Sequence, residues 1–298
     1  MVFNAIDRID HDPEVFKHKS LGLITSVSGV DRTLRSTIEI LHKRYRLKAL
    51  FAPEHGVRGD REAGEPADTT DTDAETGLPV YSLYRADSNR MTAEMLSQID
   101  AVVYDIQDIG ARYYTFLSTL LLAIKDCARF GKELIVLDRL NPLGGRVEGN
   151  LLKPDYQSFV GAYQLCIRHG LTVGELALMV NREKKLGCPL TVLPCEGWER
   201  KMLFSQTGNL WMMPSPNIPR FDTALLYPGT CLFEGTNVSE GRGTACPFEL
   251  IGAPYIDAQA LAREMNDRAL PGVLFTPAYF KPAASKHAGA VCGGVHLH

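Results

Sequence analysis

The sequence predicts an α/β protein with a Rossmann-like, doubly wound parallel sheet, followed by a second, smaller α+β domain. Two observations support this fold class. Short runs of aliphatic and β-branched residues alternate with segments of helical periodicity through about residue 198. These runs are continuously apolar, which is typical of parallel strands covered by helices on both faces. After residue 198 prolines cluster and the alternation fades.

Each predicted element of the first domain follows from its local pattern. The run 21–26 (LGLITS) is a buried strand, and in the helix after it Leu34, Ile38 and Leu41 recur at three- and four-residue spacing, which places them on one face. A later helix opens with a capping box, Thr172 to Glu175. We expect strands at residues 21–26, 47–54, 78–84, 100–107, 133–139 and 190–195, and helices at residues 33–45, 113–130 and 172–184.

The two domains are predicted to span residues 1–198 and 199–298. In the second domain one helix is expected at residues 257–269, where Leu261 and Met265 are four residues apart. The chain ends on an apolar, strand-like segment, GGVHLH, without a polar tail. Because a strand rarely ends a domain so abruptly, we expect the second domain to be C-terminally truncated.

Composition and charge exclude several classes of function. A formal net charge of −3 over 298 residues provides no basic surface for nucleic acid or an anionic membrane. No apolar run approaches the roughly 18 residues of a membrane span. The seven cysteines include no CxxC pair, so we expect reduced thiols rather than a disulfide framework. The N-terminus shows no signal peptide, which predicts a cytoplasmic protein, or a periplasmic or extracellular one if the true N-terminus is missing.

Polar residues gather after three of the predicted strands. In open α/β sheets, ligands bind beyond the carboxyl ends of the strands, and functional residues collect on loops there. Turn chemistry alone accounts for one such loop, but less well for three at one sheet edge. The candidates at these ends are Glu54, His55 and Arg58, followed by Asp60, Glu62 and Glu65; then Asp105, Asp108, Arg112 and Tyr113; and finally Asn141 and Glu148.

Other catalytic chemistries lack their motifs. The first strand is followed by SVSGV instead of GxGxxG, and no GxxxxGK[ST] loop occurs, which disfavours a nucleotide cofactor. No HExxH or HxxxH spacing surrounds His55, and no GxSxG elbow is present. We therefore expect no metal and no cofactor, and the remaining chemistry is that of carboxylates.

Glycoside hydrolysis uses a protonated carboxylic acid and a second carboxylate, about 5 to 9.5 Å apart. Glu54 is the best-placed acid, because it ends a strongly apolar strand and partial burial favours the protonated form. The alternative is a surface glutamate paired with Arg58.

At these residues the sequence resembles the exo-acting β-N-acetylmuramidases. The resemblance implies removal of terminal N-acetylmuramic acid from the non-reducing end of peptidoglycan fragments, with muropeptide glycans as substrates. It also implies a Rossmann-like domain, a smaller C-terminal domain and a cleft between them, and it places the catalytic glutamate on Glu54. The matching segments are 51–65 (FAPEHGVRGDREAGE), 76–84, 104–116, 137–149, 214–219 (PSPNIP) and 232–244 (LFEGTNVSEGRGT).

The resemblance gives the last segment a role. Arg242 is our candidate for binding the lactyl carboxylate of N-acetylmuramic acid, because arginine contacts carboxylates bidentately; a polar loop that braces the domains is the alternative. For the second carboxylate we rank Glu148, then Glu240, then Asp105, and Tyr113 is a candidate for stacking on the sugar. A non-catalytic protein that binds wall fragments is the competing function. The remaining substrate-binding candidates are Asn217, Glu234 and Asn237.

Overall fold

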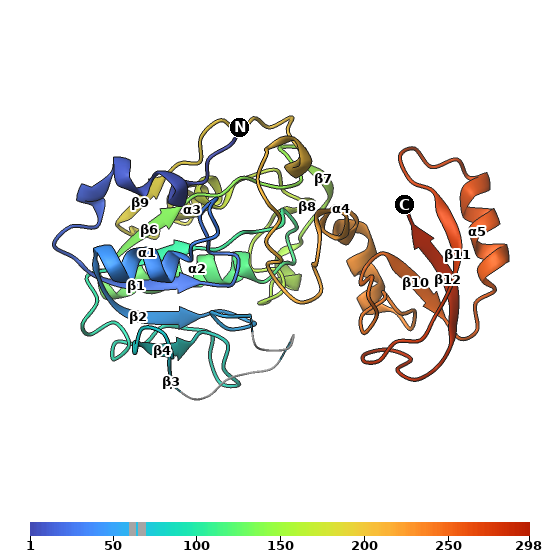
Figure 1. The fold of residues 1–298 in the computed structure, drawn as a ribbon, viewed down its shortest axis with the longest axis horizontal. Helices are drawn as coiled ribbons and strands as arrows, with labels where there is room; N and C mark the ends of the chain where they lie inside the picture. The colour runs from blue at the N-terminus through green and yellow to red at the C-terminus, as the bar shows by residue number, and fades with distance from the viewer. Residues whose placement is uncertain (60–63, 65–69) are drawn as a thin grey trace. The chain divides into compact units, whose positions relative to one another are not determined.

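The computed structural model describes residues 1–59, 64 and 70–298 (Figure 1). The chain divides into two compact units, Met1–Pro216 and Asn217–His298. The boundary predicted after residue 198 is therefore too early. Residues 199–216 belong to the first unit because they are tied to it by backbone hydrogen bonds, such as the one from Gly145 N to Arg200 O (2.6 Å).

The first unit is built on a seven-stranded sheet with the order β3-β4-β2-β1-β5-β6-β9 (Figure 1). Every neighbouring pair is parallel except β3 and β4. The six strands from β4 to β9 follow the Rossmann order, so the predicted fold class and all six predicted strands are confirmed. The strands are β1 (Ser20–Thr25), β2 (Arg46–Ala52), β3 (Asp71–Thr72), β4 (Pro79–Ser82), β5 (Ala101–Asp105), β6 (Glu133–Leu137) and β9 (Leu190–Leu193).

Helices cover both faces of this sheet. Ala101 and Val103 of β5 belong to the same core cluster as Ile38 and Leu41 of α1 (Thr37–Arg44). Because side chains alternate along a strand, Tyr104 faces the other side. There its hydroxyl donates to the carbonyl of Phe116, the first residue of α2 (Phe116–Phe130), at 3.0 Å. The sheet is thus doubly wound.

Three predicted helices of the first unit are present with shorter bounds. The helix α1 begins at Thr37 rather than residue 33, because Ser36 accepts a hydrogen bond from Glu39 N and fixes the start there. The helix α3 (Val173–Glu183) has the predicted capping box of Thr172 and Glu175. The elements that were not predicted include the hairpin of β7 (Glu148–Leu151) and β8 (Cys166–Arg168) and the 3₁₀ helices η1 (Ala5–His11), η2 (Pro13–Val15), η3 (Pro154–Tyr156) and η4 (Phe204–Gln206).

The second unit is a three-stranded antiparallel sheet packed against a helix. The strand order is β10-β12-β11, and Ala262 of the helix shares a small core with Ile251, Phe275 and Val295 of the three strands. This arrangement confirms the predicted smaller α+β domain and its single predicted helix. The elements are α4 (Phe221–Thr230), η5 (Cys231–Gly235), β10 (Leu250–Ala253), α5 (Ala258–Asp267), β11 (Phe275–Phe280) and β12 (Cys292–Leu297).

The C-terminal strand β12 is the middle strand of its sheet. It is hydrogen-bonded to β10 on one side and to β11 on the other. Both edges of β12 are therefore hydrogen-bonded within the second unit.

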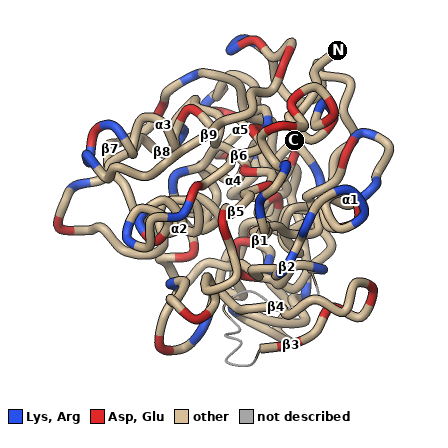
Figure 2. The backbone as a smooth tube through the Cα atoms, turned by 90° about the vertical axis from the view of Figure 1, so that its left-hand side faces the viewer, with Lys and Arg blue, Asp and Glu red and all other residues tan. Residues whose placement is uncertain are grey.

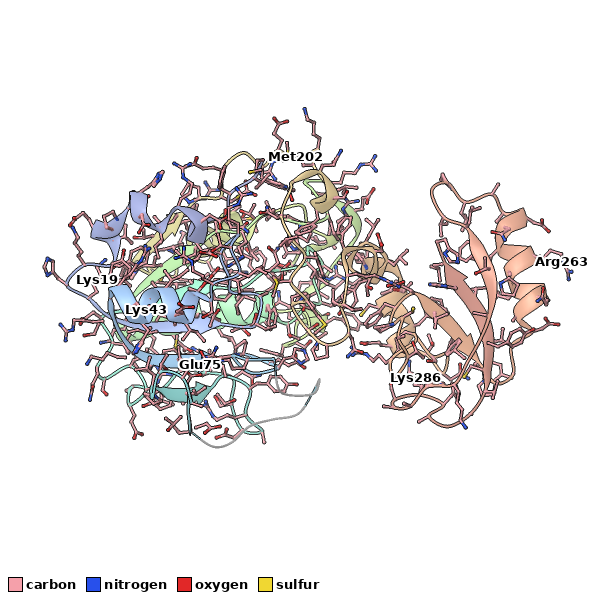
Figure 3. All side chains as sticks on the ribbon, viewed as in Figure 1. Lys19, Lys43, Glu75, Met202, Arg263 and Lys286 are labelled. Carbon is pink, nitrogen blue, oxygen red and sulfur yellow. The ribbon has the colours of Figure 1, made fainter. Side chains whose placement is uncertain are left out.

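Charged residues of both signs are interspersed along the chain (Figure 2). Many pair locally, as Lys43 (Figure 3) does with Glu39 one turn earlier on α1, at 2.7 Å. All seven cysteines are free. No helix among the described residues has the length and hydropathy needed to span a bilayer.

The carboxyl group of Asp138 joins the end of β6 to the start of α3. It accepts hydrogen bonds from the hydroxyl of Thr172 and from the backbone N–H groups of Gly174 and Arg139, at 2.8 to 3.0 Å. Burial outweighs these hydrogen bonds and raises the pKa of Asp138 from 3.8 to about 6. The folded protein therefore holds this proton more tightly than the unfolded chain.

We predict that Asp138→Asn removes a pH-dependent part of the stability. The contribution of this proton is fully present below about pH 4 and is lost as the pH rises through about 6. Asparagine keeps an acceptor for the two N–H groups and turns its amide toward Thr172. The free energy of unfolding of the variant, relative to the wild type, should thus rise on the order of 1 to 3 kcal/mol between pH 4 and pH 7.

Urea unfolding at pH 4, 5, 6 and 7 measures this difference. Asp155→Asn, in the exposed helix η3, is the control and should show little pH dependence relative to the wild type. A pH-independent difference for Asp138→Asn would contradict the prediction.

Candidate active site

Glu54 lies in a tight turn directly after β2. The N–H of Gly56 donates to the carbonyl of Pro53 at 3.1 Å and closes the turn. The third residue of the turn, His55, has a φ of +74°, a left-handed conformation that is costly for a residue with a side chain. His55 is buried, with its ring edge-on to Phe116 at a centroid distance of 6.4 Å. The turn that holds Glu54 at the carboxyl end of β2 thus contains a strained backbone conformation.

The Glu54 side chain is half-buried, and both of its carboxyl oxygens are held. The hydroxyl of Thr115 donates to Oε2 at 2.6 Å, and the N–H of Gly64 donates to Oε1 at 3.0 Å. Tyr84, which follows β4, is near enough that the negative charge of Glu54 adds to the effect of burial and raises the pKa of its phenol. Glu54 is therefore a fixed carboxyl group with a defined environment.

Arg58 pairs with other acids rather than with Glu54. Its guanidinium donates to both carboxylate oxygens of Asp73 and lies 3.0 Å from Glu75 (Figure 3). Burial alone would raise the pKa of Asp73, but hydrogen bonds from Thr76 and Arg58 more than offset it, and the pKa is lowered. The alternative ion pair between Glu54 and Arg58 is therefore wrong. Asp60, Glu62 and Glu65 of the same loop lie outside the described residues.

The candidates Asp108 and Arg112 use their polar groups to shape the loop between β5 and α2. Asp108 is buried and accepts from Gly110 N at 2.6 Å. Arg112 is buried and donates to the carbonyls of Asn150 and Leu165, at 2.5 and 2.6 Å. The structure thus gives both residues a role in loop structure that the sequence did not indicate.

Two consecutive tyrosines follow in this loop. Tyr114 is buried with its ring 5.1 Å from that of Phe116, whereas Tyr113 is half-buried. Stacking on a sugar therefore remains a prediction for Tyr113 only.

Asp105 is sealed inside the protein. Its side chain is 0% exposed, and Arg139 Nε and Nη2 donate to its two oxygens at 2.5 and 2.9 Å. The hydroxyl of Thr37 also donates to Oδ2. Because this carboxylate is buried and both of its oxygens accept from these donors, the contacts favour a structural role over the predicted catalytic one.

Asn141 is likewise buried, and its side chain makes two hydrogen bonds within the protein. Its amide donates to Leu171 O and its side-chain carbonyl accepts from Leu143 N, both at 2.9 Å. At the point where the strand order reverses between β1 and β5 lies a small hollow. Ser28, Gln107 and Trp211 line it. Doubly wound sheets bind ligands at this position.

Glu148 is exposed on β7 and belongs to a small ladder beside the loop between β5 and α2. It pairs with Arg168 on β8, whose Nη1 donates to Glu148 Oε2 at 2.7 Å. Arg168 in turn forms a β-bridge with Ala111 of the loop. Neighbouring strands lie about 4.8 Å apart, so Glu148 is only about two strand spacings from this loop.

The candidates of the second unit form an ion network of their own. Glu240 is buried and accepts from Lys286 Nζ (Figure 3) at 2.9 Å. Arg242 Nε and Nη2 both donate to Glu234 Oε1, at 2.9 and 2.6 Å, and its guanidinium lies over the ring of Phe248. Burial would lower the pKa of Arg242, but the charge of Glu234 outweighs it and raises the pKa. Arg242 is thus held rigidly within its own unit.

Two asparagine candidates lie in the same unit. Asn237 is exposed, and its backbone carbonyl is 2.7 Å from His287 Nε2. Asn217 is half-buried at the start of the unit. Substrate contacts of both side chains remain predictions.

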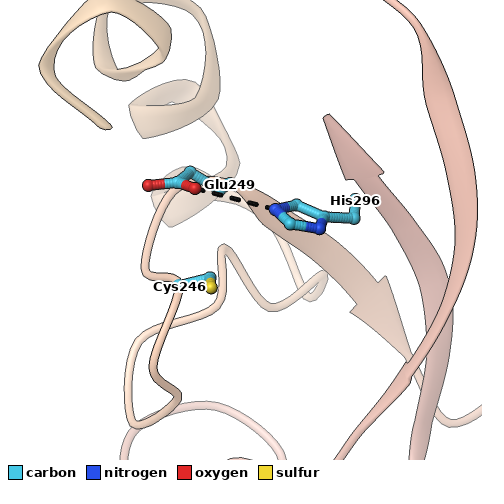
Figure 4. A group of neighbouring side chains, drawn as sticks. All are labelled: Cys246, Glu249 and His296. Atoms are coloured by element: carbon cyan, nitrogen blue, oxygen red, sulfur yellow. Dashed lines mark ion pairs between the residues drawn. The ribbon is translucent and has the colours of Figure 1, made fainter. Parts of the chain in front are cut away.

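Cys246, Glu249 and His296 present three potential metal ligands within 4.8 Å of one another (Figure 4). Arg220, however, already donates to both oxygens of Glu249, and its Nη2 is 3.5 Å from Cys246 Sγ. A guanidinium thus supplies the positive charge here, and we interpret the group as an ion network.

Sequence reasoning missed Thr115, Tyr84 and Trp211. Tyr84 carried a signal, because it ends a predicted strand beside the one that ends at Glu54. Thr115 lies inside the helix predicted at residues 113–130, where nothing in the sequence indicates a contact with Glu54. Trp211 lies in the segment that we assigned to the wrong domain.

Comparisons with known proteins agree on one family. The profile of the N-terminal domain of the exo-β-N-acetylmuramidase NamZ matches residues 21–222, and that of its C-terminal domain matches residues 225–298. The peptidoglycan β-N-acetylmuramidase NamZ of Bacillus subtilis (strain 168) is 47% identical over 285 residues, which are 95% of this chain and 68% of that protein.

Two crystal structures of DUF1343 family proteins from Bacteroides fragilis NCTC 9343 are also similar. One is 42% identical with a TM-score of 0.92, over 100% of this chain and 77% of that one. The other is 30% identical with a TM-score of 0.82, over 100% of this chain and 76% of that one. This chain thus spans about three quarters of the length of each of these two structures.

We predict that Asp105→Ala destabilises the protein strongly while Glu148→Ala does not. Removing Asp105 leaves Arg139 buried without its partner, which costs about 3 to 5 kcal/mol. Glu148 is exposed and its ion pairs contribute at most about 1 kcal/mol. Urea unfolding followed by tryptophan fluorescence compares the two variants with the wild type. An Asp105→Ala protein with wild-type stability and no activity would restore Asp105 as a catalytic residue.

Proposed function

The chain belongs to the NamZ family of exo-β-N-acetylmuramidases, and we propose that it removes terminal N-acetylmuramic acid from the non-reducing end of peptidoglycan fragments. It is a glycoside hydrolase: both family profiles match, and a relative 47% identical is a peptidoglycan β-N-acetylmuramidase. The structural observation that best supports a site is Glu54, a half-buried carboxyl group at the carboxyl end of β2 with both oxygens held.

In the proposed mechanism Glu54 acts as the general acid. Its proton passes to the glycosidic oxygen while the bond from that oxygen to the anomeric carbon breaks, and an oxocarbenium-like transition state develops. A second carboxylate either attacks the anomeric carbon or activates the water that does.

Glu148 is the proposed second carboxylate. It is exposed, and the ladder through Arg168 to Ala111 brings it beside the loop that carries Thr115, the partner of Glu54. Glu240 ranks after it, because Lys286 and Arg242 surround its buried carboxylate. Asp105 ranks last, because it is buried and its carboxylate accepts from Arg139 and Thr37.

Arg242 is the proposed partner of the lactyl carboxylate. Glu234, Glu240 and the ring of Phe248 fix its guanidinium, so little side-chain entropy remains to be lost when it binds a carboxylate. The same contacts would equally serve a purely structural arginine, and a measurement of substrate selectivity distinguishes the two roles.

The competing function, non-catalytic binding of wall fragments, has no observation in its favour. Turnover of an aryl β-glycoside of N-acetylmuramic acid by the wild-type protein would rule out this competing function.

We predict that Glu54→Gln folds normally and loses about 10²- to 10⁴-fold in kcat/KM on this aryl glycoside, because glutamine keeps the shape without the transferable proton. Glu94→Gln, at an exposed glutamate of the first unit, is the control and should keep wild-type activity. Near wild-type turnover by a well-folded Glu54→Gln protein would remove Glu54 from the mechanism.

The prediction for Arg242 concerns selectivity between two sugars that differ by the 3-O-lactyl group. A charge-assisted contact with its carboxylate contributes roughly 1.5 to 3 kcal/mol. Arg242→Ala should therefore lose about ten- to 150-fold in kcat/KM on the muramic acid glycoside and little on the N-acetylglucosamine glycoside. Lysine should recover only part, because it lacks the planar fork.

Arg58→Ala and Arg112→Ala, measured on both glycosides, complete the experiment. Equal losses on both sugars for Arg242→Ala would make Arg242 structural and transfer the role to whichever arginine shows selectivity.

A further inference from the structure

The residue before α2 does not cap the helix. The helices α1, α3 and α5 each begin after a residue whose side chain accepts a backbone hydrogen bond: Ser36, Thr172 and Asp257. Thr115 occupies the same position before α2 and belongs to the residue types that cap well, but its side chain makes no capping hydrogen bond. Its hydroxyl is directed elsewhere.

That hydroxyl donates to Glu54 Oε2 at 2.6 Å, across 61 residues of sequence. The backbone of Thr115 is in the right-handed helical region, with a ψ of −15°, whereas the three capping residues have ψ between 107° and 165°. The backbone conformation that would favour a cap is therefore replaced by one that directs the hydroxyl at Glu54.

The two partners of Glu54 differ in what they can do. The Gly64 N–H can only donate, so Oε1 must accept in every protonation state, and a proton on Glu54 resides on Oε2. A hydroxyl can rotate about its Cβ–Oγ1 bond to follow its acceptor. Thr115 can thus donate to Oε2 of the carboxylate, and in the carboxylic acid it can donate to the lone pair that Oε2 keeps, which leaves the Oε2–H proton for the glycosidic oxygen.

We propose that Thr115 is a positioning residue for Glu54, whose hydroxyl holds Oε2 in one place both before and after proton transfer. This inference rests on the proposed function, in which Glu54 supplies a proton to the glycosidic oxygen. Thr115 acts through Glu54 and not on the substrate. Its loss therefore affects the transition state, in which Glu54 is used, more than substrate binding.

The test is Thr115→Val, which keeps the shape of the side chain and removes the hydroxyl. We expect kcat on the aryl β-glycoside of N-acetylmuramic acid to fall about ten- to 100-fold, as for a lost hydrogen bond to a charged group, with KM within about twofold of the wild type. Thr115→Ser restores the hydroxyl and should recover kcat to within about threefold. Thr191→Val, which removes a hydroxyl that donates to Glu133 Oε1 at 2.7 Å, is the matched control and should keep wild-type kcat.

Unfolding in urea separates this role from helix capping. Because the Thr115 side chain does not cap α2, a loss of stability in Thr115→Val should come from its hydrogen bond to Glu54 and should disappear in a Glu54→Ala background. A loss of stability of the same size in the Glu54→Ala background would assign the residue to the helix and overturn the proposal.

A double-mutant cycle separates failure of this inference from failure of the proposed function. In the Glu54→Gln background, Thr115→Val should lower kcat no further, because its effect passes through Glu54. Full activity of Glu54→Gln would overturn both proposals. An inactive Glu54→Gln combined with wild-type kcat in Thr115→Val, or with a loss confined to KM, would overturn only the role of Thr115.

Discussion

The buried ion pair between Asp105 and Arg139 is the interaction on which the carboxyl edge of the sheet depends. Their side chains are 0% and 4% exposed, and neither charge can be left alone in so dry a place without a cost of several kcal/mol. The pair ties the end of β5 to the residues after β6. The hydroxyl of Thr37 and the carbonyl of Val30 bring in the start of α1 and the loop after β1. These contacts thus fix four chain segments relative to one another at the carboxyl edge of the sheet.

The loop between β5 and α2 is built outward from this anchor. Gln107 donates to Leu140 O, Asp108 accepts from Gly110 N, and Arg112 holds two carbonyls near the hairpin of β7 and β8. These polar groups satisfy backbone atoms and leave the loop little freedom. The rigid loop ends at Thr115, beside Glu54. Residues that the sequence marked as substrate contacts therefore form the supporting layer that a precise site requires.

The sequence could predict the six parallel strands, because a strand covered on both faces is apolar throughout. It could not predict β7, which is exposed at all four positions, or β11, an edge strand that contains Pro277. The same limit applies to the site. Glu54 and Asp105 both end apolar strands in the sequence. They differ in the structure because Asp105 is buried in an ion pair with Arg139, and a partner 34 residues away cannot be recognised from the sequence. Thr115 could not be predicted, because the helix expected at residues 113–130 included it and its partner Glu54 lies 61 residues away in the sequence.

Two features that lower local stability lie next to Glu54 in the structure. His55 holds a left-handed backbone at a cost of order 1 kcal/mol or more, and α2 forgoes a cap worth about 1 kcal/mol. A threonine that donates to a carboxylate can still cap a helix, because Thr172 caps α3 and donates to Asp138 at the same time. The missing cap at Thr115 therefore does not follow from its hydrogen bond alone. Violations of local rules concentrate where function overrides stability. Their convergence on one half-buried carboxyl group is an argument for Glu54 that does not depend on the resemblance to any family.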